Sequence, residues 1–149
     1  MVSWLAIKVE LLSGRDIVLE HPAGRVMVAS PSHTLAELAE AIDIAFARWD
    51  HSHLHVFEVS DGGRFMLGGS EFEPDVVDTE SVTLDALDLR EGASFEYVFD
   101  LGDGWRHRCE VRSAEVDPVE AYGVLPDTPV PVWGWGWVPD QYGRISEDE

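Results

Sequence analysis

Residues 95–111, FEYVFDLGDGWRHRCEV, decide the fold predicted from this sequence. Two runs of alternating side-chain character flank Leu101–Gly104, where Gly and Asp favour the backbone conformations of a chain reversal. Alternate residues of a strand point to opposite faces, so the rings of both runs gather on one side. The segment therefore predicts an antiparallel hairpin in which Phe99 lies opposite either Trp105 or His107. The residues predicted to face the interior are Phe95, Tyr97, Phe99, Trp105, His107, Cys109 and Val111.

Several further strands follow from the same alternation. Residues 4–12 place Leu5, Ile7, Val9 and Leu11 on one side and charged residues on the other. A second hairpin is expected where Ser60–Gly63 joins two alternating runs. Pro22 and Gly24 predict a break in the segment that follows the first strand. The predicted strands are residues 4–12, 17–19, 25–29, 53–59 and 64–67.

Residues 34–49 predict one long amphipathic helix. Thr34 and Glu37 have the spacing of a capping box, which marks the first turn. Apolar residues then recur at intervals of three and four as far as Trp49, with Glu37, Glu40, Asp43 and Arg48 off the stripe. The expected fold is α+β, a curved and largely antiparallel sheet of about five to seven strands with this helix packed on one face. Phe46→Asp should then unfold the protein.

Length and composition favour one domain over residues 1–149. A chain of 149 residues with 45% hydrophobic composition can bury one substantial core. From about residue 114 we expect an irregular tail rich in Pro, Gly and Trp. Prolines at 126, 129, 131 and 139 exclude regular helix over most of it.

Charge and cysteine usage restrict the partners and the location. With 29 acidic and 10 basic residues, the net charge of −19 disfavours direct nucleic-acid binding, because phosphates would be repelled. Arg106, Arg108 and Arg112 are expected in cross-strand ion pairs. The sequence has no signal peptide and no run of roughly 20 apolar residues, so we expect no membrane association. Cys109 is the single cysteine and a disulfide within the chain is impossible, which fits the reducing cytoplasm.

Three stretches of the chain carry a family resemblance: WDHSHLHVF at residues 49–57, FEYVFDLGDGWRH at residues 95–107, and the Gly/Pro tail. Together they resemble the plasmid pRiA4b Orf-three-like family, some members of which are labelled TnpR-like passenger proteins of insertion elements. The resemblance covers most of the chain and implies an α+β fold with no established activity. The family's tail typically reads Gly-x-Gly-x-Cys-Pro-Pro-Glu-Asp. Residues 134–143 lack its cysteine, second proline and Glu-Asp pair, so a site completed by that tail in relatives is altered or absent here.

The histidines allow two interpretations. His53 and His55 have the spacing of one strand face, and with His107 they could hold zinc at a site with an open position. Alternatively, His53 and His107 are core histidines that hydrogen-bond to Asp100, Asp103 or a backbone carbonyl. We favour the second interpretation and expect no cofactor, because no further Cys or His element completes a zinc motif. Asp100 and Asp103 are interpreted as turn formers rather than as an acid–base pair.

The aromatic residues suggest a binding surface. Trp133, Trp135, Trp137 and Tyr142 could form a surface for a peptide or small ligand together with Trp105. We favour the interpretation that they form a lid that completes a small core. The favoured function is a non-enzymatic binding or regulatory module with a protein or small-molecule partner, and the alternative is a metal-dependent hydrolase using His53, His55 and His107. The predicted binding residues lie between the 53–59 strand, the central hairpin and the tail. They are Trp49, His53, His55, Tyr97, Asp103, Trp105, His107 and Trp135.

Overall fold

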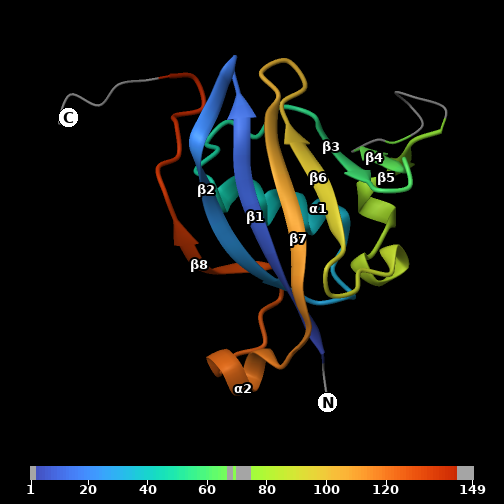
Figure 1. Ribbon diagram of the computed structural model, residues 1–149. Coiled ribbons are helices and arrows are strands. Elements are labelled where there is room, and N and C mark those ends of the chain that lie inside the picture. Colours follow the sequence, from blue (N-terminus) through green and yellow to red (C-terminus); the bar gives the residue numbers. More distant parts are fainter. Residues whose placement is uncertain (1–2, 67–68, 70–74, 144–149) are drawn as a thin grey trace.

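The computed structural model describes residues 3–66, 69 and 75–143, in which one mostly antiparallel sheet carries a helix against one face (Figure 1). The α+β fold expected from the sequence is confirmed, with eight strands in the described residues in the order β5-β4-β3-β6-β7-β1-β2-β8. Among the strand pairs of the described residues, only β4–β5 is parallel. The elements are β1 Trp4–Gly14, β2 Ile17–Ala29, α1 Leu35–Ala45, β3 His55–Val59, β4 Arg64–Met66, β5 Val77–Asp78, the 3₁₀ turns η2 Thr79–Ser81 and η3 Leu84–Leu87, β6 Ser94–Phe99, β7 Trp105–Val116, α2 Pro118–Tyr122 and β8 Val130–Trp135.

The central hairpin is formed by β6 and β7 and confirms the first of the two expected registers. Phe99 lies opposite Trp105, and Tyr97 lies opposite His107. Asp100 adopts a left-handed conformation with φ of 63°, and its carboxylate Oδ1 accepts hydrogen bonds from the Gly102 and Asp103 amides at 3.0 and 3.2 Å. Asp100 thus has the turn-forming role that the sequence predicts.

Strand β2 is longer than the sequence suggests. The predicted break at His21–Gly24 does not occur, because β2 runs unbroken from Ile17 to Ala29 beside β1. The register shifts where Leu11 pairs with Ala23 and Ser13 pairs with Val18. The extra residues of β2, Pro22 among them, are therefore accommodated as an irregularity within a continuous strand.

Helix α1 begins as predicted and ends earlier. The Thr34 hydroxyl accepts from the Glu37 amide at 3.1 Å and the Glu37 carboxylate accepts from the Thr34 amide at 2.9 Å, so the capping box is present. The helix stops at Ala45 and does not reach Trp49. Ala47 has φ of 58° and donates its amide to the Ile44 carbonyl, while the Arg48 amide reaches the Asp43 carbonyl. These two bonds are those of a Schellman motif, which ends a helix.

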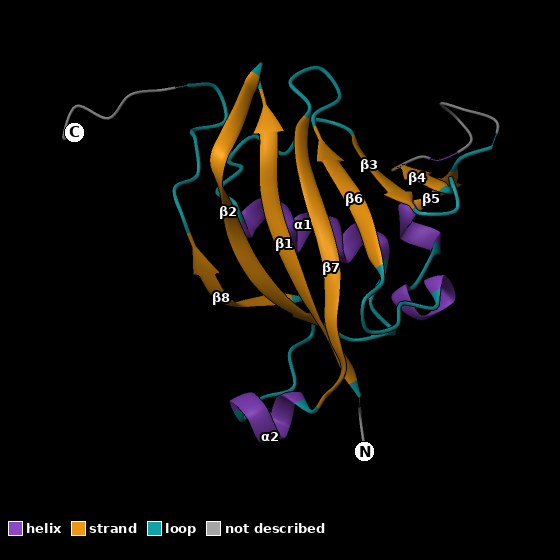
Figure 2. Cartoon of the chain, viewed as in Figure 1, coloured by secondary structure: helices purple, strands orange, loops and turns teal. Residues whose placement is uncertain are grey.

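The core lies between α1 and the face of the sheet that α1 covers (Figure 2). It includes the interior residues of β1, β6 and β7, and Phe46 from the end of the helix. A smaller cluster consists of Val56 on β3, Met66 on β4, Val98 on β6 and Val76, which directly precedes β5. The sequence places Asp43 and Arg48 off the apolar stripe of the helix, whereas the structure buries both residues.

The tail contains more regular structure than the sequence predicts. Residues expected to be irregular form the end of β7, helix α2 and strand β8, which pairs with β2. Pro131 lies within β8, a position that an edge strand tolerates because one side of it makes no ladder hydrogen bonds. The alternation of residues 130–135 is compatible with this strand, but the prolines argue against a strand when the sequence is considered alone.

Candidate functional site

A polar cluster forms where three segments meet: the residues after α1, the β6–β7 turn and the tail. The Tyr142 hydroxyl donates to Asp50 Oδ2 at 2.6 Å, and His53 Nε2 lies 2.5 Å from the same hydroxyl oxygen. On the other side of the imidazole, His53 Nδ1 lies 3.7 Å from Asp100 Oδ2. The side chains of His53 and Asp50 are each 31% exposed. We call these residues, Asp50, His53, Asp100 and Tyr142, the Asp50–Tyr142 cluster.

Hydrogen bonds fix the charge state of two members of this cluster. The Ser52 hydroxyl and the Tyr142 hydroxyl both donate to the Asp50 carboxylate, and they hold its pKa well below its usual range. The same Asp50 carboxylate raises the pKa of Tyr142 to about 12, and the charges of Asp100 and Asp103 act in the same direction. At neutral pH the cluster therefore contains ionised Asp50 beside a protonated phenol.

Gln141 fastens the tail to this cluster. Its side chain is fully buried, and its Oε1 accepts from the backbone amides of Trp49 and Asp50, each at 3.0 Å. Its Nε2 donates to the Asp50 carbonyl at 2.9 Å. The next residue, Tyr142, packs edge-to-face on the Trp49 ring with centroids 5.1 Å apart. The tail is thus held by backbone groups that the end of α1 leaves available.

A second polar cluster is buried beneath the end of α1. The Tyr97 hydroxyl donates to Asp43 Oδ1 at 2.7 Å, and burial raises the pKa of Asp43 to about 8. The Arg48 guanidinium lies 4.3 Å over the Trp105 ring, and burial lowers its pKa to about 10. In the described part of the chain, none of the guanidinium nitrogens has a hydrogen-bond partner. The polar side chains of this cluster are therefore enclosed by the apolar core.

His107 belongs to this buried cluster. Its Nδ1 donates to the Tyr97 carbonyl at 3.1 Å, which is the backbone hydrogen bond that one interpretation of the sequence expects. Burial lowers the pKa of His107 to about 3, so the imidazole is neutral at physiological pH. Cys109, on the same strand face, is also fully buried, and burial raises the pKa of its thiol. Neither side chain reaches the surface.

The structure divides the predicted binding residues into those at the Asp50–Tyr142 cluster, those buried in the protein, and Trp135. Trp49, His53 and Asp103 lie at or beside the Asp50–Tyr142 cluster, and Trp49 is 50% exposed. Tyr97, Trp105 and His107 are fully buried in the core. His55 is also buried, with its Nε2 3.1 Å from the Thr79 hydroxyl.

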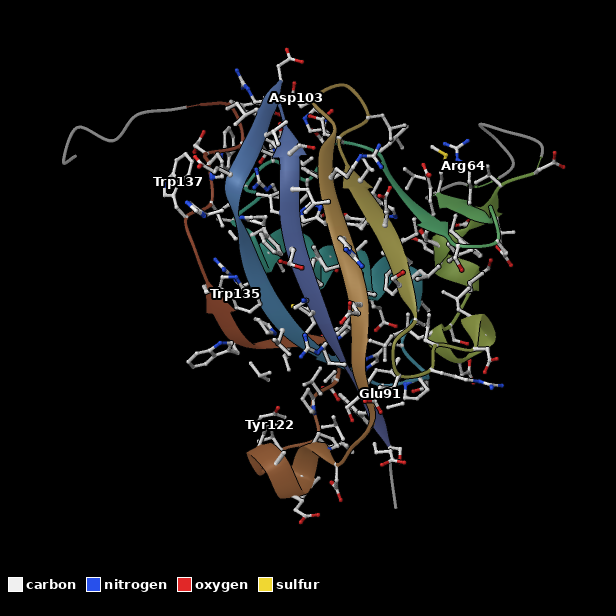
Figure 3. The ribbon with its side chains drawn as sticks, in the orientation of Figure 1. Arg64, Glu91, Asp103, Tyr122, Trp135 and Trp137 are labelled. Atoms are coloured by element: carbon white, nitrogen blue, oxygen red, sulfur yellow. The ribbon has the colours of Figure 1, made fainter. Side chains whose placement is uncertain are left out.

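Trp135 lies apart from the other predicted residues. It is on β8, and β6, β7, β1 and β2 intervene between that strand and β3 in the sheet. Figure 3 shows Trp135 well away from Asp103 at the hairpin turn. Its ring covers Gly24, where an added Cβ would lie 2.1 Å from the indole. The structure therefore does not bring Trp135 into the cluster.

The three histidines proposed as metal ligands have separate partners. His53 contacts Tyr142, His55 contacts Thr79, and His107 contacts the Tyr97 carbonyl. Among the residues that the structure describes, no group of three or more His, Cys, Asp or Glu side chains is arranged to hold a metal ion. The predicted three-histidine set is thus not assembled in the described fold.

Sequence reasoning missed Asp43, Arg48 and Gln141. It named Tyr142 as a binding residue beside the tryptophans, but not as the partner of Asp50 and His53. Asp43 and Arg48 look like ordinary solvated positions because the helical period assigns them to the polar side. The only local signal for the turn that buries them would be a glycine at position 47, and the chain has alanine there. Gln141 and Tyr142 lie in a tail without periodicity, so their partners, about 90 residues earlier, have no sequence signature.

Comparison with known proteins places this geometry in a family. Residues 4–129 match the family model described as plasmid pRiA4b ORF-3-like protein. The chain belongs to this family. An uncharacterized protein, y4hQ, from Sinorhizobium fredii is 36% identical over 78 residues, which are 52% of this chain and 39% of that protein. This pRiA4b ORF-3-like chain thus matches well under half of the relative's length.

A solved structure has the same fold. The crystal structure of a protein of unknown function from Methanosarcina mazei Go1 matches with a TM-score of 0.68 and 19% identity, covering 90% of this chain and 70% of that one. At this identity the likeness concerns the fold alone. In the described residues, no helix combines the length and apolar character needed to cross a membrane.

Proposed function

We propose that this pRiA4b ORF-3-like protein is a non-enzymatic binding module whose Asp50–Tyr142 cluster recognises a cationic group of a protein or small-molecule partner. The observation that carries the proposal is the half-exposed Trp49 ring, packed on Tyr142, whose hydroxyl donates to the ionised Asp50 carboxylate. An aromatic face next to a carboxylate is a favourable site for an ammonium or guanidinium group.

The charge of the whole molecule supports a cationic partner. The net charge of −19 creates a field that attracts positive ligands and accelerates their encounter with the protein. Locally, Asp100 and Asp103 lie close enough to act electrostatically on Tyr142, so Asp50 is one of several acids around the aromatic pair. The basic side chains of the outer sheet face include Arg106, which is already paired with Glu96.

The protonation states favour binding over catalysis. A hydroxyl whose pKa is raised to about 12 is a poor nucleophile, so Tyr142 is better suited to positioning Asp50 than to attacking a substrate. Cys109 and His107 are fully buried and cannot touch a ligand bound at the surface cluster. The hydrolase alternative would need the three histidines to meet, and in the described fold each has its own partner.

Nuclear magnetic resonance titration tests this proposal with three probes: the acetylated methylamides of lysine, arginine and norleucine. We expect the two cationic probes to shift the Trp49 indole resonance with millimolar affinity and the neutral probe to leave it unchanged. Asp50→Asn should weaken cation binding, while Glu20→Gln, which removes an exposed carboxylate on β2, should not. Equal binding of norleucine, or an unaffected Asp50→Asn variant, would contradict the proposal.

A further inference from the structure

Strand β8 forms an edge of the sheet with an unusual composition. It pairs with β2 on one side, and in the described residues no strand pairs with its other side. Residues 128–139 contain no charged side chain, although the chain has 39 charged residues in total, 29 acidic and 10 basic. Natural edge strands are usually protected by charges, by prolines or by covering elements. Within β8 itself, Pro131 is a protective residue of this kind.

Exposed tryptophans accompany this edge. Trp133 on β8 is 70% exposed and Trp137 just beyond the strand is 71% exposed. Figure 3 shows the Trp137 side chain on the outer side of the segment that continues from β8. Contiguous exposed aromatic surface is uncommon on monomeric proteins and is enriched at interaction sites. The interpretation favoured from the sequence, in which these tryptophans complete a core, does not fit the exposure of Trp133 and Trp137.

An apolar groove runs beside this edge, between β8 and α1. Ala41 and Ile44 line it from the helix, and Pro129, Val130 and Pro131 line it from the strand. Its volume is about 320 Å³, and Ile44 is 61% exposed although its side chain is apolar. Glu37 and Glu40 complete the helix side of the lining. The groove therefore combines an apolar surface with acidic flanks.

We propose that the β8 edge and this groove bind an extended basic segment of a partner protein, which adds to the sheet as a further strand. Backbone groups of the segment would pair with the open side of β8, as in β-strand addition. Alternate side chains of a strand point to opposite faces, so one set would enter the groove beside Ile44. Lys or Arg residues flanking that apolar side chain would meet Glu37 and Glu40. This surface is separate from the Asp50–Tyr142 cluster and does not depend on its function.

The chemistry of the surface favours such a partner over a second copy of this chain. Pairing two β8 edges would bring two molecules of net charge −19 together, with Glu37 and Glu40 of each near the interface. Residues 128–139, which would form the other half of that interface, supply no basic side chain to compensate these acids. A basic segment would supply a strand that pairs with β8 and positive charges that compensate Glu37 and Glu40.

The test uses a displayed library of random nine-residue peptides, selected against the full chain. We expect the enriched peptides to place Lys or Arg two residues before or after an apolar residue, so that both side chains lie on the face of the added strand toward α1. A synthetic copy of the best peptide should slow hydrogen exchange of the amides in Val130–Trp135. Ile44→Glu should weaken its binding roughly tenfold or more, and Glu40→Lys should shift selection toward acidic peptides. Val18→Glu introduces the same charge at an exposed apolar residue of β2 and should leave binding unchanged.

Three results would overturn this proposal. The first is an enriched pool without basic residues at this two-residue spacing, or no enrichment at all. The second is a peptide that binds without protecting the β8 amides or that ignores Ile44→Glu in a variant whose circular dichroism matches the parent. The third is sedimentation showing a dimer of this chain that Trp133→Asp dissociates, because the edge would then be occupied by a second copy.

Discussion

Replacing Asp43 by Asn should make the protein more stable at alkaline pH, with little gain in acid. The Asp43 carboxyl is buried, and its pKa of about 8 in the folded protein compares with about 3.8 for an unperturbed aspartate. The folded state holds this proton more tightly than the unfolded state. The stabilisation that Asp43 contributes is therefore fully present below about pH 4 and is lost as pH rises toward 8. Asn retains an oxygen that can accept from the Tyr97 hydroxyl and has no proton to lose.

The size of this effect follows from the pKa. Each pH unit across the window is worth about 1.4 kcal/mol, so the parent protein should lose on the order of 3 kcal/mol from this group between pH 5 and pH 8. The nearby Arg48 guanidinium favours the ionised carboxylate, an effect already contained in the pKa of Asp43. The free energy of unfolding of Asp43→Asn relative to the parent should therefore rise by that amount across the same interval.

Urea denaturation at several pH values measures this difference directly. Glu20→Gln is the matched control, because it removes an exposed carboxylate from β2 and its difference from the parent should stay nearly constant with pH. Carbon-13 detection of the Asp43 carboxyl gives an independent titration curve for the folded state. A stability difference that does not change between pH 5 and pH 8, or a carboxyl that titrates near pH 4, would refute the argument.

Four further substitutions test the packing around the site. Gln141→Glu should cost about 2 kcal/mol or more of unfolding free energy at pH 8, because an ionised oxygen would replace the donor to the Asp50 carbonyl; a smaller loss at pH 5 would follow from protonation. Ala47→Gly should gain about 0.5–1 kcal/mol by relieving the positive φ, whereas Ala45→Gly within α1 should lose stability; thermal melting checks both signs. Phe46→Asp should abolish the cooperative melt followed by circular dichroism, because Phe46 is fully buried.

The parts of the fold that the sequence predicts are those with local causes. The central hairpin follows from period-two alternation on both sides of a turn whose residues favour reversal. This pattern allows Trp105 or His107 opposite Phe99, and the structure has Trp105 there. The start of α1 follows from the reciprocal bonds of Thr34 and Glu37, which need only a spacing of three. In both cases the deciding atoms lie within a few residues or directly across one hairpin.

The parts that escape prediction depend on distant contacts. Strand β8 exists because β2 offers it an edge, although its own sequence contains Pro131. Gln141 is a site residue only because the end of α1 presents two amides and a carbonyl to it. A pattern within the tail cannot reveal a partner that another segment creates, so the tail is where the sequence-based description fails most.

The turn at Phe46–Arg48 links the two polar clusters. If α1 continued to Trp49, the amides of Trp49 and Asp50 would bond within the helix and would not be available to Gln141. The same continuation would leave Arg48 on the polar side of the helix, away from Trp105. Ending the helix with Ala47 in a left-handed conformation instead buries Arg48 and exposes Trp49. One unfavourable backbone conformation, stabilised by tertiary contacts, therefore creates both the buried cluster and the surface at which we propose that a cation binds.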